Sequence, residues 1–334
     1  MSDHLKIDRR QMLALGAGAA ALAGQAASAQ TEPAGSDGPD LTGKSILVTG
    51  ASSGFGRLGT EYYARQGAKV FATMRNVPRA EADQLTALAE SDGLDITVIE
   101  IDVTSDEQVV AGVAEALETN DGKLDVLINN AGISVGGPVE VQDMAATELI
   151  FDTNVYGCHR MARAVLPSMR ANGGGQIFNV SSQLGRLIIP GFGMYSATKF
   201  ALEAMSEQMA YELVPHGVDV TIIQPGGYPT NIWANNNANS APLKERTSKE
   251  LLAAYPELTA GMGERTGGGS TDPMDIPRAI AEIIAMPKGT RPLRKAVHPV
   301  ARPQEAVNAV AAETQIAMLG QSPLGPWIKD VLER

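Results

Sequence analysis

A tyrosine and a lysine stand four residues apart in the segment YSATK, at Tyr195 and Lys199. On a helix this spacing places both side chains on one face. The pKa of a free phenol is about 10, so tyrosine moves protons poorly at neutral pH unless a nearby cation lowers that pKa. We expect Lys199 to lower the pKa of Tyr195, and Tyr195 to act as a general acid or base. An ordinary surface pair would show the same spacing. Other residues must therefore decide whether this pair is catalytic.

Upstream of this pair, Ser181 ends the apolar run GQIFNVS and Ser182 follows it directly. Alternate side chains of a strand point to opposite faces, so only one of the two can face Tyr195. A hydroxyl there would donate a hydrogen bond to a substrate oxygen and stabilise the charge that develops on it.

Three glycines, Gly50, Gly54 and Gly56, follow the first apolar run in VTGASSGFGR and open a helical pattern. Glycines let the backbone turn tightly and approach a pyrophosphate, and the helix start presents free N–H groups to it. The strand–turn–helix context predicts a dinucleotide site.

The second apolar run ends at Met74 and Arg75, in FATMRN. NAD-selective folds usually carry an acid here, which holds the ribose 2′-hydroxyl. With no acid to repel it, a 2′-phosphate can pair with Arg75. This favours NADP(H), with NAD(H) as the alternative; in that case Arg75 is an ordinary solvated loop residue.

The elements that position these residues alternate between short apolar runs and helical patterns. The runs are KSILVTG, AKVFATM, ITVIEID, KLDVLIN, GQIFNVS and VDVTIIQP, and a further strand is possible at 291–297. Continuous apolar strands separated by helices indicate a parallel sheet covered on both faces. We predict the α/β fold class: a Rossmann-type, doubly wound sheet of about seven strands. It forms one domain over 42–300, followed by a helical tail over 301–334 with a helix at 303–319.

The N-terminus reads as a targeting segment. Arg9 and Arg10 precede a short apolar run, and an A-x-A pattern ends at Ala29. This resembles a twin-arginine export signal over 1–29, and 30–41 reads as a Pro/Gly-rich linker. The pattern predicts a periplasmic protein with no membrane attachment in its mature form; a cytoplasmic location is the alternative.

The composition of the chain limits which classes of partner it can bind. The net charge of -11 and the pI near 4.9 argue against nucleic acid as a partner. A single cysteine, Cys158, excludes an intrachain disulfide, and the four histidines lack metal-ligand spacing.

The motifs occur together in one order: TGASSGFG (49–56), IDV (101–103), NNAG (129–132), Asn154, NVSS (179–182), YSATK (195–199) and PGGYPT (225–230). In this order they resemble the short-chain dehydrogenase/reductase family. Ser53 stands where the extended branch of that family has its middle glycine, so the resemblance is to the single-domain branch.

The resemblance implies cofactor-binding roles. Asp102 would bind the adenine amino group, Asn129 would hold the sheet together near the cofactor, and Thr230 would hold the nicotinamide carboxamide. The full implied set is Gly50, Ser52, Ser53, Gly54, Phe55, Gly56, Arg75, Asp102, Val103, Asn129, Ala131, Gly132, Tyr195, Lys199, Pro225, Gly226 and Thr230.

It also implies a catalytic set of Asn154, Ser182, Tyr195 and Lys199. Ser182 is chosen over Ser181 because the family spaces its serine and tyrosine by 13 residues, and 195 minus 182 is 13. Lys199 would also bind the nicotinamide ribose, and Asn154 would hold a relay water.

The implied reaction is hydride transfer between a secondary alcohol and a ketone or aldehyde. A non-catalytic dinucleotide-binding protein is the alternative, although it would be expected to have lost Tyr195 or Lys199. Family members commonly form homodimers or homotetramers through two long helices, here about 145–171 and 195–214.

Two segments would contact a small-molecule alcohol or carbonyl substrate. The first, after Ser182, is apolar at Leu184, Ile188, Ile189 and Phe192. The second, over 231–258, is polar and rich in asparagine, with Trp233 and Tyr255 as aromatic contacts. We expect the second segment to be mobile, either as a lid or as a surface insert without a role.

Overall fold

The computed structural model describes residues 38–334. The predicted export signal over 1–29 and most of the predicted linker lie outside this range. Within it, seven parallel strands form one sheet in the order β3-β2-β1-β4-β5-β6-β7, which confirms the predicted fold class. The strands are β1 (Ser45–Thr49), β2 (Lys69–Met74), β3 (Ile96–Glu100), β4 (Val126–Asn129), β5 (Gly175–Val180), β6 (Val218–Pro225) and β7 (Arg294–Val297).

Each central strand sends alternate apolar side chains to the two faces of the sheet. In β1, Leu47 packs into one core while Ile46 and Val48 pack into the other. Because both faces are buried, the strands read as unbroken apolar runs instead of alternating ones. This is why six of the seven strands could be predicted directly from the sequence.

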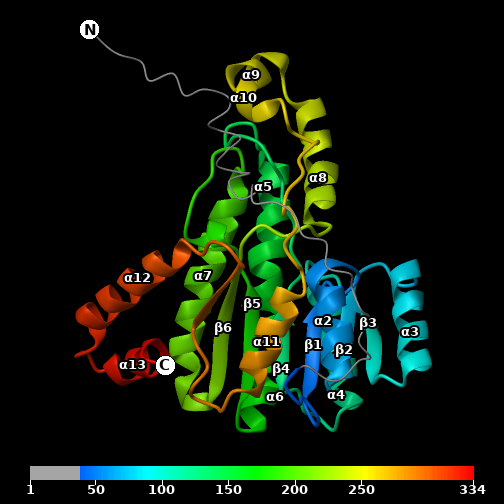
Figure 1. Cartoon of the computed structure of the whole chain (residues 1–334), viewed down its shortest axis with the longest axis vertical. Helices are drawn as coiled ribbons and strands as arrows, with labels where there is room; N and C mark the ends of the chain where they lie inside the picture. The colour runs from blue at the N-terminus through cyan, green and yellow to red at the C-terminus, as the bar shows by residue number, and fades with distance from the viewer. Residues whose placement is uncertain (1–37) are drawn as a thin grey trace, which may run out of the picture. The chain divides into compact units, whose positions relative to one another are not determined.

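Helices cover the two faces separately. The core of the first face joins the sheet to α4 (Asp106–Glu118), α6 (Gly157–Ala171) and α7 (Met194–Leu213). The core of the second face joins it to α2 (Gly54–Arg65) and α11 (Asp275–Ala285). A smaller cluster packs α3 (Ala80–Asp92) against β2 and β3, and α3 lies beside β3 in Figure 1.

The long helix expected around 145–171 is interrupted by a wider turn. It consists of α5 (Met144–Phe151), a π-helical segment η1 (Asp152–Tyr156) and α6. Single π turns inside α-helices frequently occur at functional sites. Here the π turn contains Asn154, whose side chain is only 1% exposed.

The asparagine-rich insert is helical, contrary to the expectation of a mobile loop. It forms α8 (Ile232–Arg246), α9 (Lys249–Ala254) and α10 (Pro256–Thr259), which lie together in Figure 1. Amide hydrogen bonds explain this outcome, because the buried Asn236 donates to Ser134 Oγ at 2.7 Å and the part-buried Asn239 donates to the Ser134 carbonyl at 3.2 Å. The asparagines therefore fasten α8 to the loop after β4.

Two helices follow β7. The first, α12 (Gln304–Leu319), agrees with the predicted helix over 303–319, and the second is α13 (Gly325–Leu332). Val331 of α13 joins the core of the first face, and Arg334 pairs with Asp219. Among residues 38–334, no helix combines the length and apolar character needed to cross a bilayer.

Candidate active site

The glycine turn after β1 is built so that only glycine fits. Gly50 and Gly54 have φ angles of 69° and 55°, in the left-handed region that side chains disfavour. A Cβ on Gly56 would lie 2.4 Å from the Gly50 carbonyl oxygen and 2.5 Å from Asn130 Nδ2. The turn thus brings its backbone and the start of α2 into close contact with the loop after β4.

The start of α2 is open to an anion. No side chain caps it, and its first turn contains no acid. By contrast, Ser105 caps α4 and Asp143 caps α5 through side-chain hydrogen bonds. Free N–H groups and the positive end of the helix dipole, beside Ser52 and Ser53, fit the phosphates of a dinucleotide.

Two residues outside the predicted set hold this turn in place. Thr49 Oγ1 accepts hydrogen bonds from the backbone N–H groups of Asn130 and Ala131, at 2.9 and 3.0 Å. Asn130 in turn donates from Nδ2 to the Thr49 carbonyl at 2.9 Å. The second asparagine of NNAG was the sequence signal for this contact.

Asn129 joins the ends of two neighbouring strands. Its Nδ2 donates to Asn179 Oδ1 at 2.8 Å across β4 and β5, and Asn179 donates to Ser206 Oγ at 2.7 Å on α7. The pair therefore links two strand ends to the helix that carries Tyr195.

The PGGYPT loop returns to the glycine turn. A Cβ on Gly54 would lie 3.5 Å from Thr230 Cβ, so these two residues face each other. Beside them the ring of Phe55 meets that of Tyr228 edge-on at 5.5 Å. Pro225 ends β6, and the Gly226 N–H donates to the Val297 carbonyl at 3.0 Å.

Arg75 is an exposed cation at the end of β2, with no ion pair among the described residues. Its neighbours Arg57 and Arg79 are paired with Glu61 and Glu81. Glu100, which the sequence reasoning did not consider, accepts from the Val77 N–H at 3.3 Å and so reaches toward the same loop.

Asp102 and Val103 follow β3 on the same edge of the sheet. The Asp102 carboxylate accepts from the Thr104 N–H at 2.9 Å and from its hydroxyl at 2.8 Å. Val103 is buried and lies against Gly157, where a Cβ would come within 2.8 Å of Val103 Cγ2.

Ser182 rather than Ser181 is the hydrogen-bond partner of Tyr195. Ser182 Oγ accepts from the Leu184 N–H at 3.1 Å, which leaves its own proton free to donate. Ser181 Oγ is buried without a partner in the described chain and faces Gly185.

The pKa of Tyr195 is raised to about 12 because burial disfavours the phenolate, and the hydrogen bond with Ser182 lowers it only in part. Lys199 is not among the groups that shift the pKa of Tyr195 here, so the lowering of this pKa by Lys199 stays a prediction. Lys199 Nζ lies 5.7 Å from the Tyr195 ring centroid and donates to the Val180 carbonyl at 2.9 Å. Burial lowers the pKa of Lys199 itself to about 8, while the nearby Cys158 and Glu203 raise it.

The side-chain amide of Asn154 makes two hydrogen bonds to the backbone of a single residue, Ile133. Its Oδ1 accepts from the Ile133 N–H at 2.8 Å, and its Nδ2 donates to the Ile133 carbonyl at 2.9 Å. A Cβ on Gly132 would lie 3.3 Å from Asn154 Oδ1 and 3.8 Å from Lys199 Nζ. Asn154, Gly132 and Lys199 therefore meet beneath the loop after β4.

Gln142 sets the start of the tyrosine helix, and no spacing in the sequence indicated it. Its Oε1 accepts from the Met194 N–H at 2.7 Å, and its Nε2 donates to the Val135 carbonyl at 2.7 Å. Gly193 has a φ of 51°, and a Cβ there would lie 2.2 Å from Gln142 Nε2. This buried amide joins the loop after β4 to the first turn of α7.

A buried ion network lies one turn beyond Lys199. Glu203, only 2% exposed, accepts from Arg294 Nε at 2.8 Å and from Gln224 Nε2 at 2.8 Å. Arg294 also pairs with Glu207, and Arg186 lies 3.5 Å from Glu203. The network ties α7 to β7 and β6.

The residues predicted to contact the substrate differ in exposure and in their hydrogen-bond partners. Leu184 is buried, whereas Ile188 and Ile189 are exposed. Trp233 donates from Nε1 to the Tyr228 carbonyl at 2.9 Å, and Tyr255 donates to Glu140, so both rings have structural partners.

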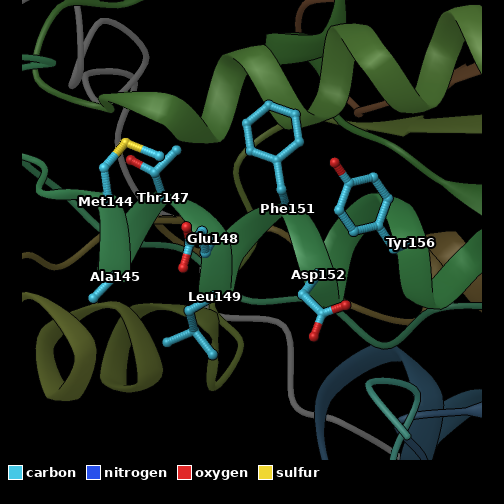
Figure 2. Close-up of a pocket in the computed structure, with 8 residues that line it drawn as sticks. All are labelled: Met144, Ala145, Thr147, Glu148, Leu149, Phe151, Asp152 and Tyr156. Atoms are coloured by element: carbon cyan, nitrogen blue, oxygen red, sulfur yellow. The ribbon is translucent and has the colours of Figure 1, made fainter. Parts of the chain in front are cut away.

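The pocket drawn in Figure 2 is separate from the candidate active site. It follows α5 and η1 from Met144 to Tyr156, and none of the predicted site residues lines it. Residues 38–334 contain no cluster of three metal-ligating side chains, and Cys158 is a buried free thiol whose pKa burial raises to about 11.

Residues 44–241, more than half of the chain, match the family described as short chain dehydrogenase. The chain belongs to the short-chain dehydrogenase family. It is accordingly an oxidoreductase of that family, whose members act on small-molecule substrates.

Curated relatives and solved structures agree with this family. The 3-ketodihydrosphingosine reductase of Bacteroides thetaiotaomicron is 32% identical, over 76% of this chain and 88% of its own length. A short-chain dehydrogenase from Streptomyces avermitilis is 31% identical with a TM-score of 0.65, covering 84% of this chain and 98% of that one. A short-chain dehydrogenase/reductase from Burkholderia phymatum, solved in complex with NAD, is 25% identical with a TM-score of 0.66, covering 85% and 97%.

Proposed function

We propose that the protein is an NADP(H)-dependent oxidoreductase that interconverts a secondary alcohol and a ketone or aldehyde. One observation carries this proposal: Ser182, Tyr195 and Lys199 cluster at the carboxyl edge of the sheet, beside an uncapped helix start at a glycine turn. Ligands of doubly wound sheets bind at this edge, where the strand order reverses. Here the reversal lies between β1 and β4.

The nicotinamide ring of a bound dinucleotide supplies or accepts the hydride. In the reductive direction, the Tyr195 hydroxyl donates its proton to the substrate oxygen, and in the oxidative direction the phenolate takes that proton back. The Ser182 hydroxyl, whose oxygen is already held by Leu184, donates to the same substrate oxygen. The Lys199 ammonium stabilises the phenolate as it forms, and Asn154 fixes the loop after β4 that borders the site.

Charge at the end of β2 supports NADP(H) over NAD(H). Arg75 is available to a 2′-phosphate, whereas Arg57 and Arg79 are paired with acids. Solved relatives of this family hold either NAD or NADP, so family membership does not choose the dinucleotide and the choice rests on local charge.

The test is Tyr195→Phe, which keeps the ring that packs against the buried cluster containing Val135 but removes the hydroxyl. We expect NADPH binding, measured by nucleotide fluorescence, to persist while carbonyl reduction falls at least about 100-fold. Tyr211→Phe, on the same helix and also a hydrogen-bonded hydroxyl, is the matched control and should keep its activity. Undiminished turnover by Tyr195→Phe would refute the mechanism. Wild-type NADPH binding without turnover of any carbonyl or alcohol would favour the non-catalytic alternative.

We also propose export of the folded protein to the periplasm by the twin-arginine route, on the strength of Arg9, Arg10 and the A-x-A pattern ending at Ala29. A fusion of residues 1–35 to a reporter should reach the periplasm, and a fusion carrying lysines at positions 9 and 10 should not. Recovery of the wild-type fusion only from the cytoplasm would refute export.

A homodimer or homotetramer is the third part of the proposal. Apolar side chains on the two long helices are exposed, with Met144 at 67%, Leu149 at 46% and Phe200 at 38%. Figure 2 shows Met144 and Leu149 along α5. Light scattering should give a mass of at least two chains, and Leu149→Asp should reduce it to one. A monomeric wild-type protein would refute this part.

A further inference from the structure

Arg265 lies between the two loops that flank Tyr195, at a position fixed by its backbone. Its N–H donates to Asn237 Oδ1 at 2.7 Å, and its carbonyl accepts from Asn237 Nδ2 at 2.9 Å. Asn237 belongs to α8, and α8 is fastened to the loop after β4 by Ser240, whose Oγ accepts from the Gly136 N–H at 2.8 Å. The location of Arg265 is therefore set by two part-buried hydrogen bonds to a helix that is itself fastened by a buried one.

The guanidinium lies over the ring of Phe192, which is next to Tyr195. Its Cζ lies 4.9 Å from the ring centroid of Phe192, and that ring lies 6.4 Å from the ring of Tyr195. A Cβ on Gly136 would lie 3.3 Å from Arg265 Nε, and one on Gly191 would lie 2.8 Å from Arg265 Nη2. Glycine at both positions leaves room for the guanidinium between the loops, which the Gly137 N–H joins by donating to the Gly191 carbonyl at 2.8 Å.

No carboxylate compensates this cation in the part of the chain that the structure describes. Every other half-buried arginine there has an acidic partner within 4.0 Å; these are Arg57, Arg79, Arg160, Arg186, Arg291, Arg294 and Arg334. Glu140, on the loop after β4, accepts instead from the Tyr255 hydroxyl. Burial lowers the pKa of Arg265, and no neighbouring charge raises it.

A half-buried guanidinium without a carboxylate partner costs desolvation free energy, and pairing with an anion offsets that cost. Its planar fork matches a carboxylate with two parallel hydrogen bonds, and the face of Phe192 holds it from the other side. The neighbouring lysine, Lys244, donates to the carbonyls of Ala260 and Met262 at 3.3 and 3.4 Å. One cation fits one negative charge, which favours a carboxylate over a phosphate ester.

We infer that Arg265 binds a carboxylate of the substrate, so that the enzyme acts on oxo acids and hydroxy acids. This inference rests on the proposed oxidoreductase function and names its substrate class. The carboxylate pairs with the guanidinium, while the carbonyl carbon lies at Tyr195 and Ser182.

The test compares aliphatic oxo acids with their methyl esters, using the full mature enzyme and NADPH. A charged hydrogen bond contributes about 1.5–3 kcal/mol, which corresponds to a preference in kcat/KM of about 10- to 150-fold for the acid. Arg265→Met should abolish that preference by lowering activity on the acid and leaving the ester unchanged. Arg265→Lys, which keeps the charge, should retain part of it. Arg163→Met, at an exposed arginine of α6 without an ion pair among the described residues, should behave as wild type.

Three results would overturn the inference. The wild-type enzyme could show no preference for the acid over the ester, or Arg265→Met could lose kcat/KM equally on both. The third is a phosphate ester of a hydroxyketone that is reduced with a higher kcat/KM than the oxo acids. If wild type reduces neither acid nor ester, the proposed function fails and a binding measurement decides the role of Arg265. Octanoate, but not octanamide, should then raise the thermal midpoint of wild type and not that of Arg265→Met. Equal shifts in the two proteins would refute the site.

Discussion

The ammonium of Lys199 donates a hydrogen bond to the backbone carbonyl of Val180, 2.9 Å away, at the end of β5. This contact fastens the tyrosine helix to the strand that precedes Ser182. Burial of the ammonium lowers the pKa of Lys199 to about 8, and burial of the phenol raises the pKa of Tyr195 to about 12. At neutral pH the pair is therefore an ammonium beside a neutral phenol.

The first prediction concerns pH. Above about pH 8, Lys199 loses the charge that stabilises the forming phenolate, whereas Tyr195 keeps its proton up to about pH 12. We expect kcat/KM for carbonyl reduction to be level below about pH 8 and to fall above it. Lys199→Arg, which stays charged, should move this alkaline limit upward. A limit at the same pH in both proteins would assign it to another group.

The second prediction tests the ion network beyond Lys199. Glu203 raises the pKa of Lys199, so Glu203→Gln should move the alkaline limit of reduction to lower pH. The change also leaves Arg294 short of a buried partner and should cost about 3–5 kcal/mol in the free energy of unfolding. Glu207→Gln is the matched control, because Glu207 also pairs with Arg294 but is not among the groups that shift Lys199. If Glu203 has only a structural role, Glu203→Gln should lower the free energy of unfolding but leave the alkaline limit of reduction at the same pH.

The third prediction concerns Gln142 as a positioning residue. Gln142→Leu would leave the Met194 N–H and the buried Val135 carbonyl without their partner, at about 1–3 kcal/mol each in the free energy of unfolding. Because α7 begins at Met194, one residue before Tyr195, we expect kcat to fall more than KM rises. Gln142→Glu, which still accepts from Met194, should recover part of kcat. Loss of stability with wild-type kcat would limit Gln142 to a folding role.

The fourth prediction concerns cofactor choice. Arg75→Asp replaces the unpaired cation at the end of β2 with an acid, and should shift the ratio of kcat/KM from NADPH toward NADH. Removing one charged pair from a phosphate corresponds to about 10-fold or more. Glu100→Gln removes the acid at the end of the neighbouring strand. If that acid repels the 2′-phosphate, the ratio of kcat/KM with NADPH to that with NADH should rise in this variant. An unchanged ratio in Arg75→Asp would remove Arg75 from the proposal.

The strands could be predicted because burial on both faces leaves an unbroken apolar run, as in β1 and β4. The glycine turn could be predicted for the same kind of local reason, since Gly50 and Gly54 adopt left-handed angles that other residues avoid. In both cases the cause lies within a few neighbouring residues.

Features that depend on distant contacts could not be predicted in this way. The asparagines of α8 weaken a helix when considered alone, but buried contacts such as that of Asn236 with Ser134 hold it in place. Arg265 stands in a glycine-rich segment with no motif, and only the fold brings it to Phe192. The pKa of Tyr195 depends on burial, which the spacing to Lys199 does not report.

The π turn at Asp152–Tyr156 has a consequence for changes in chain length. A wider turn holds one residue more than an α turn would, and each residue of an α-helix rotates the direction of its side chain by about 100°. Deleting a single residue between α5 and α6 would let the helix run on regularly, but would rotate Asn154 away from Ile133 or the residues of α6 away from the sheet. The segment should therefore tolerate many substitutions on its exposed side and no single-residue deletion, whereas a deletion in a surface turn such as that at Asp121–Gly122 should be mild.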